Sequence, residues 1–207
     1  MIPSPDRRFV ILAEGMFGGD ASKTARGVIK YSSSPTLAVI DSTKAGRTVG
    51  DVIGHVASGG HVDIPIVASL DEALAVPGPR ATTLVIGVAP AGGKLSPAWR
   101  STIRQALEEG LDVVNGLHMF LGDDAEFTDA AARGGGKIYD FRRPPERMEV
   151  ANGREHLPGK RVILTIGTDC ASGKMGVSVE LAKAAREAGF TAAMAPTGQT
   201  GMMIEGW

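Results

Sequence analysis

Short apolar runs alternate with amphipathic stretches along the N-terminal part of the chain. Each run has the length of a buried strand, and the residues between runs have helical spacing. This alternation is typical of a parallel sheet that is covered by helices. We expect six strands, at residues 9–13, 37–40, 64–67, 84–88, 112–114 and 137–141. The pattern therefore predicts an α/β fold with a Rossmann-like N-terminal domain.

The helix expected at residues 97–109 has the most complete boundary signals. Ser96 is suited to the N-cap, Pro97 to the first helical position and Gly110 to the stop. Its apolar side chains share one face, and they are Trp99, Ile103, Ala106 and Leu107. We expect this helix to cover one face of the sheet.

A strand, a glycine-bounded loop and a helix follow one another at residues 161–189. Backbone N–H groups of such a loop and of the first helical turn converge on an anion, and a lysine adds positive charge. The segment predicts a phosphate-binding loop, and the alternative is a glycine-rich turn that binds no ligand. The residues expected to hold phosphates are Gly167, Thr168, Asp169, Cys170, Ser172, Gly173, Lys174 and Met175.

Met175 stands directly after the loop lysine, where a phosphate loop normally has a serine or threonine whose hydroxyl binds Mg²⁺. A thioether is a poor ligand for a hard cation that prefers oxygen. Thr168 and Ser178 carry hydroxyls, but neither occupies the usual place. The loop therefore favours binding of a phosphate-bearing cofactor over phosphoryl transfer, and we expect no metal site.

Further candidate site residues follow the expected strands, where ligands bind in open parallel sheets. Lys23 and Thr24 end a glycine-rich loop after the first strand, which is either an anion site or a tight turn. Asp41 ends the second strand, and it either binds a ribose or caps the following turn. Asn115 follows the fifth strand.

His118 lies just past the fifth strand, with two acidic residues, Asp123 and Asp124, close by in the sequence. This is a suitable place for an acid–base residue. In the alternative interpretation, His118 is a half-buried packing residue and one of the two aspartates is the N-cap of the next helix. The sequence leaves both interpretations open.

The C-terminal segment contains too few elements to bury both faces of a sheet. We expect a strand at residues 191–195 and then ligand contacts from Thr197, Gln199 and Thr200, close to the phosphate loop. We therefore expect a Rossmann-like domain at residues 1–141, a linker at 142–160, and the first part of an incomplete P-loop domain at 161–207.

Composition excludes several classes of protein. The 207 residues are 43% hydrophobic and 22% charged, with a net charge of −1 and a single cysteine, Cys170. No basic patch indicates nucleic-acid binding, and no apolar run indicates a leader or a membrane span. A lone cysteine allows no internal disulfide. We expect a cytoplasmic homo-oligomer that acts on a small-molecule substrate.

Three resemblances narrow the function. The Gly-Thr-Asp and Gly-Lys pairs of the loop resemble those of dethiobiotin synthetase. IPIVASLDEAL and LVIGVAPAGG resemble the CoA-binding domain of succinyl-CoA ligase alpha subunits. EGMFGGDASKTARGVIKY, NGLHMFLGDD, GTDCASGKM and APTGQTGMMIEGW resemble a family with a Rossmann-like half and a P-loop half. That family was long catalogued as a domain of unknown function and includes D-glutamate N-acetyltransferases.

The family resemblance implies acetyl transfer from acetyl-CoA to the amine of D-glutamate or a similar acidic amino acid. The phosphate loop would then hold the phosphates of CoA, and His118 is the first candidate for the base. One alternative is an ATP- and Mg²⁺-dependent kinase or ligase of the dethiobiotin synthetase type. Another is a non-catalytic module that binds a nucleotide or CoA.

Overall fold

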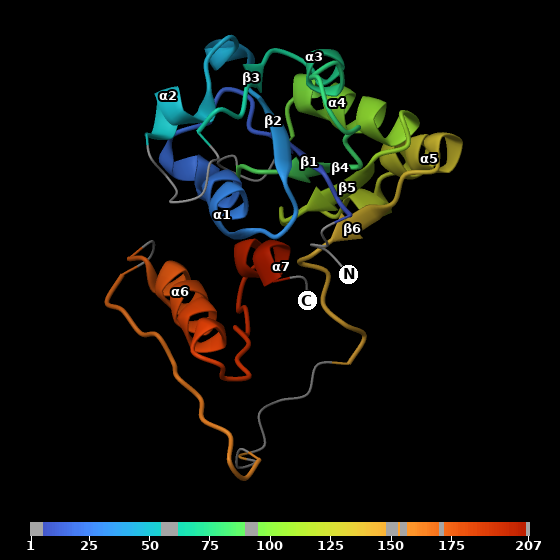
Figure 1. Cartoon of the computed structure of the whole chain (residues 1–207). Coiled ribbons are helices and arrows are strands. Elements are labelled where there is room, and N and C mark those ends of the chain that lie inside the picture. The colour runs from blue at the N-terminus through green and yellow to red at the C-terminus, as the bar shows by residue number, and fades with distance from the viewer. Residues whose placement is uncertain are drawn as a thin grey trace. The chain divides into compact units, whose positions relative to one another are not determined.

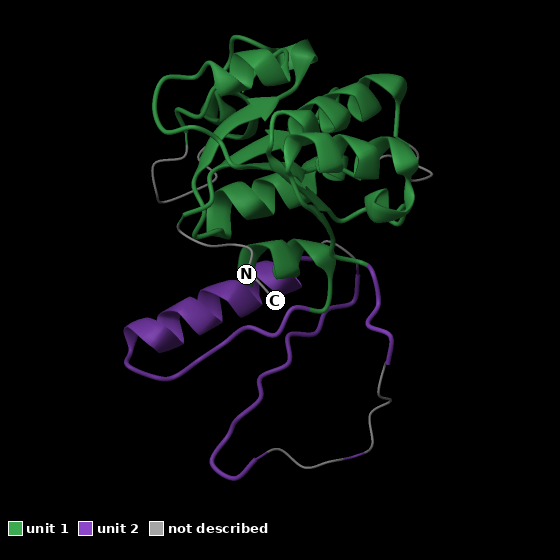
Figure 2. Cartoon of the chain, turned by 90° about the vertical axis from the view of Figure 1, so that its right-hand side faces the viewer, with its two compact units in different colours: residues 1–142, 197–207 green, residues 143–196 purple. Residues whose placement is uncertain are grey.

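The chain forms two compact units. A computed structural model describes residues 6–54, 62–89, 95–147, 153, 157–169 and 172–205. One unit, called unit 1, comprises residues 1–142 together with 197–207 (Figure 2). The other, unit 2, comprises residues 143–196. The chain therefore leaves unit 1 and later returns to it.

A six-stranded parallel sheet forms the centre of unit 1 (Figure 1). Its strands are β1 (Phe9–Leu12), β2 (Thr36–Ile40), β3 (Ile66–Val67), β4 (Thr83–Ile86), β5 (Asp112–Asn115) and β6 (Ile138–Asp140). All six expected strands are confirmed. Strand β3 begins only after Pro65, a residue that has no N–H to donate to a neighbouring strand.

The strand order is β3-β2-β1-β4-β5-β6, so the direction of winding reverses between β1 and β4. Val10 of β1 lies beside Ala38 of β2 on one side and Leu84 of β4 on the other. Since parallel crossovers are right-handed, the reversal puts α1 (Lys23–Tyr31) and α4 (Pro97–Glu108) on opposite faces of the sheet. The carboxyl ends of β1 and β4 meet at the point where open sheets of this kind bind ligands.

The core of unit 1 lies on both faces of this sheet. Every residue of β1 and β4 is buried, which explains why these strands, apart from Thr83 at the start of β4, are apolar instead of alternating. Close packing of a helix on the sheet requires Gly87, because a Cβ there would lie 2.4 Å from the Ile11 side chain and 2.8 Å from the Ala25 side chain. The largest fully buried side chains include Phe9, Phe17, Phe127, Ile11, Leu12 and Ile103.

Sequence signals at the helix ends correspond to caps in the structure. Ser96 accepts a hydrogen bond from the Trp99 amide at the start of α4. Asp124 accepts one from the Glu126 amide at the start of α5 (Ala125–Gly134), which ends at Gly135 with a φ of 83°. The other short elements are η1 (Asp20–Ser22), η2 (Ser42–Lys44), α2 (Val49–Ile53), α3 (Leu70–Leu74) and η4 (Leu121–Asp123).

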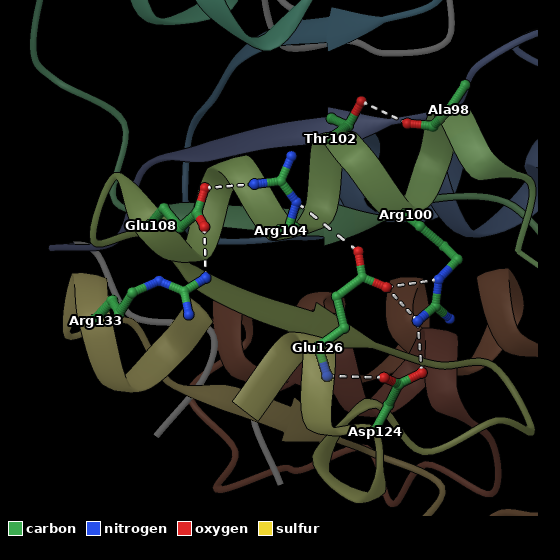
Figure 3. Close-up of polar contacts among 8 residues, drawn as sticks. All are labelled: Ala98, Arg100, Thr102, Arg104, Glu108, Asp124, Glu126 and Arg133. Carbon is green, nitrogen blue, oxygen red and sulfur yellow. Dashed lines mark hydrogen bonds and ion pairs between the residues drawn. The ribbon is translucent and has the colours of Figure 1, made fainter. Parts of the chain in front are cut away.

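A network of ion pairs joins α4 to α5 on the surface of unit 1 (Figure 3). Arg100 pairs with Asp124 at 2.8 Å and also with Glu126. The Arg100 guanidinium additionally lies 4.6 Å from the centre of the Phe127 ring. The remaining members of the network are Arg104, Glu108 and Arg133.

Unit 2 contains helix α6 (Lys174–Glu187) but no strand among its described residues. The strands expected at 162–166 and 191–195 are therefore wrong for this structure. The side chains of Val162, Ile163 and Leu164 are 64–77% exposed. A strand needs a neighbour for its backbone hydrogen bonds, and the described part of this unit supplies none.

The last helix, α7 (Gln199–Glu205), packs within unit 1 although it follows the phosphate-loop segment in sequence. It contacts α1, and Met203 belongs to the buried core of the sheet. A Cβ on Gly116, directly after β5, would lie 2.8 Å from side-chain atoms of both Gln199 and Met203. Helix α7 therefore covers part of the carboxyl edge of the sheet.

Candidate functional site

The phosphate loop of unit 2 closes around the ammonium group of Lys174. Lys174 Nζ donates to the carbonyl oxygen of Asp169 and to Ser172 Oγ, the second at 3.1 Å. Ser172 Oγ in turn donates to the same Asp169 carbonyl at 3.1 Å. The lysine thus holds both sides of the loop together.

Two glycines give this loop its shape. Gly173 is the N-cap of α6 and has a φ of 89°, in the left-handed region that favours glycine. A Cβ on Gly167 would lie 2.7 Å from Ser172 Oγ and 3.3 Å from the Lys174 side chain. The backbone conformation at residue 173 therefore favours glycine, and a side chain at residue 167 would displace Ser172 or Lys174.

This arrangement is suited to binding an anion. Helix α6 has 14 residues, and the N–H groups of its first turn have no partner within the helix. The Lys174 ammonium and the helix dipole both favour negative charge at this end. A phosphate oxygen can replace the carbonyl and hydroxyl oxygens that Lys174 now contacts.

The remaining residues predicted for the loop are only partly placed. Thr168 is exposed, and Met175 is half-buried in the first turn of α6. Cys170 lies outside the described residues. In the described part of the chain, no three His, Cys, Asp or Glu side chains come together in a way that could hold a metal ion.

Asp41 holds together the loops that follow β1 and β2 in unit 1. It is fully buried, and its carboxylate accepts hydrogen bonds from the amides of Gly15 at 3.1 Å and Phe17 at 3.0 Å. It also accepts from the Thr43 amide at 3.1 Å and from Lys44 Nζ at 3.0 Å. Of the two interpretations that the sequence left open, the structure shows the cap.

The same contacts bear on the glycine-rich loop after β1. Two of its amides already bind the Asp41 carboxylate, and the Gly18 amide donates to Ser22 Oγ at 3.0 Å. The side chain of Lys23 is exposed at the start of α1, whereas Thr24 is buried and its hydroxyl lies 2.8 Å from that of Thr200. The loop forms a tight turn whose amide groups are used internally.

Asn115 fixes the loop that carries His118. Its side-chain amide donates to the Met119 carbonyl and to Asp140, both at 2.7 Å, and its oxygen accepts from the Leu117 amide at 2.9 Å. His118 itself is exposed and forms no hydrogen bond with another described residue. The loop therefore presents an accessible imidazole on a fixed backbone.

The candidate residues that follow the strand expected at 191–195 lie in or beside α7. Thr197 is exposed, and Gln199 Oε1 accepts from Arg142 Nη2 at 2.8 Å. Arg142 Nε also donates to the Gly116 carbonyl at 2.7 Å. Gln199 and Thr200, which we expected to contact a ligand, lie in α7, where their side chains bond to Arg142 and Thr24.

Sequence reasoning missed two residues that shape the carboxyl edge. Arg142 was assigned to a linker, although it joins the end of β5 to α7. Asp140, the last residue of β6, accepts hydrogen bonds from the amides of Leu121 and Gly122 and so holds η4 in place. An aspartate at a strand end was the available signal for the second. Nothing in the pattern distinguished Arg142 from Arg143.

Among the described residues, no helix combines the length and the apolar character that crossing a membrane requires.

Two family models match the chain. One, described as a domain of unknown function (DUF1611_N), Rossmann-like domain, matches residues 42–144. The other, described as a domain of unknown function (DUF1611_C), P-loop domain, matches residues 149–207. The matches follow one another along the chain in the order in which we expected the two domains.

Two curated relatives are each named D-glutamate N-acetyltransferase. The one from Tritonibacter scottomollicae is 40% identical over 138 residues, which are 67% of this chain and 40% of the relative. The one from Pseudoalteromonas is 36% identical over 126 residues, 61% of this chain and 37% of the relative. The chain thus spans less than half the length of the curated relatives it matches.

A crystal structure of a DUF1611 family protein from Anabaena variabilis has the same fold. Its TM-score is 0.85 at 37% sequence identity, over 97% of this chain and 56% of that chain.

Proposed function

Because the chain belongs to the DUF1611 family, in which a Rossmann-like domain is joined to a P-loop domain, we propose that it serves an N-acetyltransferase reaction. In this reaction the acetyl group of acetyl-CoA passes to the amine of D-glutamate or a similar acidic amino acid. The names of two relatives support the acceptor. The observation that carries the proposal is the glycine-bounded loop that surrounds the Lys174 ammonium.

The loop supplies cofactor binding in this proposal. CoA carries a pyrophosphate and a ribose phosphate, and either one offers oxygens to the loop amides and to Lys174. Charge-assisted hydrogen bonds from an ammonium to a phosphate are stronger than those between neutral groups. Binding of this kind needs no phosphoryl transfer, so a loop without the usual hydroxyl after its lysine is sufficient.

The reaction also requires a base. The substrate amine must lose a proton before its nitrogen attacks the thioester carbonyl, and the C–S bond then breaks to release CoA as the thiol. We assign the base to His118, whose exposed imidazole stands on a loop fixed by Asn115 and Asp140. An imidazole can accept a proton near neutral pH.

Release of CoA thiol tests the proposal directly. The 207-residue chain and a chimera would be incubated with acetyl-CoA and D-glutamate. In the chimera, the Tritonibacter relative supplies the residues beyond the matched region. We expect thiol release that depends on D-glutamate, together with N-acetyl-D-glutamate by mass spectrometry. The relative itself is the positive control, and an inactive chimera beside an active relative would contradict the proposal.

His118→Gln and Lys174→Ala separate the two proposed roles. We expect His118→Gln to lower kcat by roughly 10²-fold or more, with little change in KM for acetyl-CoA. Lys174→Ala should mainly raise that KM. ADP release that requires Mg²⁺ would favour a kinase or ligase, and CoA binding without turnover would favour a binding module.

A further inference from the structure

Phosphate loops usually offer a divalent cation a hydroxyl directly after the lysine, and this chain has Met175 there. Met175 lies in the first turn of α6. Mg²⁺ requires oxygen ligands in a nearly octahedral arrangement, and a thioether sulfur does not serve it. The position that normally fixes the metal beside the phosphates therefore has no suitable donor.

The nearest hydroxyls on the helix side of the loop are engaged with each other. Ser178 Oγ lies 2.7 Å from Thr165 Oγ1 and donates to the Lys174 carbonyl at 3.1 Å. Thr165 Oγ1 lies 3.2 Å from the same carbonyl. Ser178 is also one turn further along α6 than the usual metal-binding hydroxyl. These contacts turn both hydroxyls toward the helix backbone.

The positive charge in the loop comes from Lys174. Its ammonium lies between the Asp169 carbonyl and Ser172 Oγ, inside the span of the loop. No cluster of metal-binding side chains accompanies it in the described parts of the chain. The residues present thus fit an anion that is neutralised by an ammonium and backbone amides, and they do not fit a magnesium–phosphate complex.

We infer that this loop binds phosphate esters without a divalent cation, and that residue 175 decides this. The inference rests on the proposed function, because it takes the loop as the binding site for cofactor phosphates. It adds a ligand class to that site. The loop should prefer phosphate esters such as CoA, whose phosphates are bound but not transferred. Nucleotides that require Mg²⁺ for binding and phosphoryl transfer should bind less well.

Calorimetric titration of the chain with CoA and with inorganic pyrophosphate tests the inference. Each titration is run with excess Mg²⁺ and again with EDTA. We expect the Kd for CoA to agree within about twofold between the two conditions, and Mg²⁺ should not tighten the binding of pyrophosphate, since no metal bridges protein and ligand. Lys174→Ala should weaken the binding of both probes about tenfold or more, to the same extent with Mg²⁺ as with EDTA.

A gain-of-function variant probes residue 175 itself. Met175→Thr restores the usual hydroxyl and should bind ATP about tenfold more tightly with Mg²⁺ than with EDTA. Met175→Leu has a similar size but no oxygen, so its binding should remain independent of the cation. If Met175→Thr gains no Mg²⁺ dependence, the assignment of residue 175 is wrong.

Two results would overturn the inference as a whole. In one, EDTA abolishes binding of CoA and pyrophosphate to the unmodified chain and Mg²⁺ restores it. In the other, neither probe binds under either condition. Cation-independent binding of CoA without any acetyl transfer would leave the inference standing and would remove the proposed function instead.

Discussion

Two apolar segments of similar pattern have different structures in this chain. Residues 9–12 form β1, pair with two neighbouring strands and are fully buried. Residues 162–166 have a similar strand-like composition, but their four apolar side chains stay exposed and no strand forms there. Apolar periodicity therefore indicates only that a segment is suited to burial. A strand forms only where adjacent backbone supplies hydrogen bonds on its edges.

The difference has an energetic consequence. Burying apolar surface stabilises a fold by roughly 25 cal/mol per Å², so the exposed side chains of residues 162–164 contribute little. The stability of unit 1 rests on its own sheet and on the helices that cover it. Substitutions in the two units should therefore have very different costs, and this expectation can be tested residue by residue.

Phe127 provides the largest expected effect. It is fully buried in the core of unit 1, and Phe127→Ala should lower the free energy of unfolding by about 3–5 kcal/mol through lost burial and a residual cavity. Ile163→Ala, at a site that is 76% exposed, should cost less than about 0.5 kcal/mol. Urea denaturation followed by tryptophan fluorescence measures both. Equal costs would show that residue 163 is buried in solution.

Asp41 should have the next largest effect. Burial alone would raise its pKa, but hydrogen bonds from Thr43, Lys44 and the amides of Phe17 and Gly15 outweigh burial, so its pKa lies below the ordinary value. Asp41→Asn removes the charge that these donors stabilise. We expect it to lower the free energy of unfolding by about 1.5–3 kcal/mol at neutral pH.

The pH dependence follows from the direction of this shift. A carboxylate with a lowered pKa in the folded state stabilises the fold above its unfolded pKa of about 3.9, and this stability is lost as pH falls through the folded value. The difference between wild type and Asp41→Asn should thus be constant above about pH 5 and shrink in more acidic solution. Asp129→Asn, at an exposed helix position, is the control. A difference that grows with acid would contradict the assignment.

Much of the fold of unit 1 could be predicted because its signals are local. Six apolar runs give six strands, and Ser96 and Gly110 mark the ends of a helix that the structure has at nearly the same residues. The order of the strands in the sheet could not be predicted in this way, because it depends on contacts between distant segments. The sequence of residues 191–195 likewise contains nothing that reveals whether a partner strand is present.

The candidate site, too, could be predicted only where its signals are local in the sequence. The loop around Lys174 was predictable because glycine spacing and a following helix lie within one short segment. The bond between Thr24 and Thr200 joins residues 176 positions apart, so no local pattern could indicate it. The side chains of Asp41 and Asn115, two candidate ligand residues, bind the backbone of segments distant in sequence or in the next loop, which spacing alone does not reveal.

Thr200 tests how firmly α7 is attached to unit 1. Thr200→Val keeps the shape of the side chain but removes the hydroxyl that lies 2.8 Å from that of buried Thr24. We expect a loss of about 1 kcal/mol, seen as roughly fivefold faster amide exchange in residues 199–205. Thr128→Val, which removes an exposed hydroxyl from α5, should leave that exchange unchanged. Unchanged exchange in Thr200→Val would mean that the Thr24–Thr200 hydroxyl pair contributes nothing to holding α7.

Among the buried or paired positions, Glu126 should have the smallest effect, and it contrasts sharply with its neighbour Phe127. Glu126 pairs with Arg100 and Arg104 on the partly exposed surface between α4 and α5 (Figure 3). Glu126→Gln should cost only about 0.3–1 kcal/mol at low salt, because water already screens these charges. The Arg100 side chain keeps its contact with the Phe127 ring and its ion pair with Asp124.

Salt separates the two neighbouring positions. Raising ionic strength to about 1 M shortens the screening length to about 3 Å, so the cost of Glu126→Gln should fall toward zero. The cost of Phe127→Ala comes from lost apolar contacts and should remain large. A cycle that combines Glu126→Gln with Arg100→Gln would measure their coupling directly. If that coupling persisted at high salt, the pair would act through packing or short hydrogen bonds, and α4 and α5 would be held together by more than the buried side chains between them.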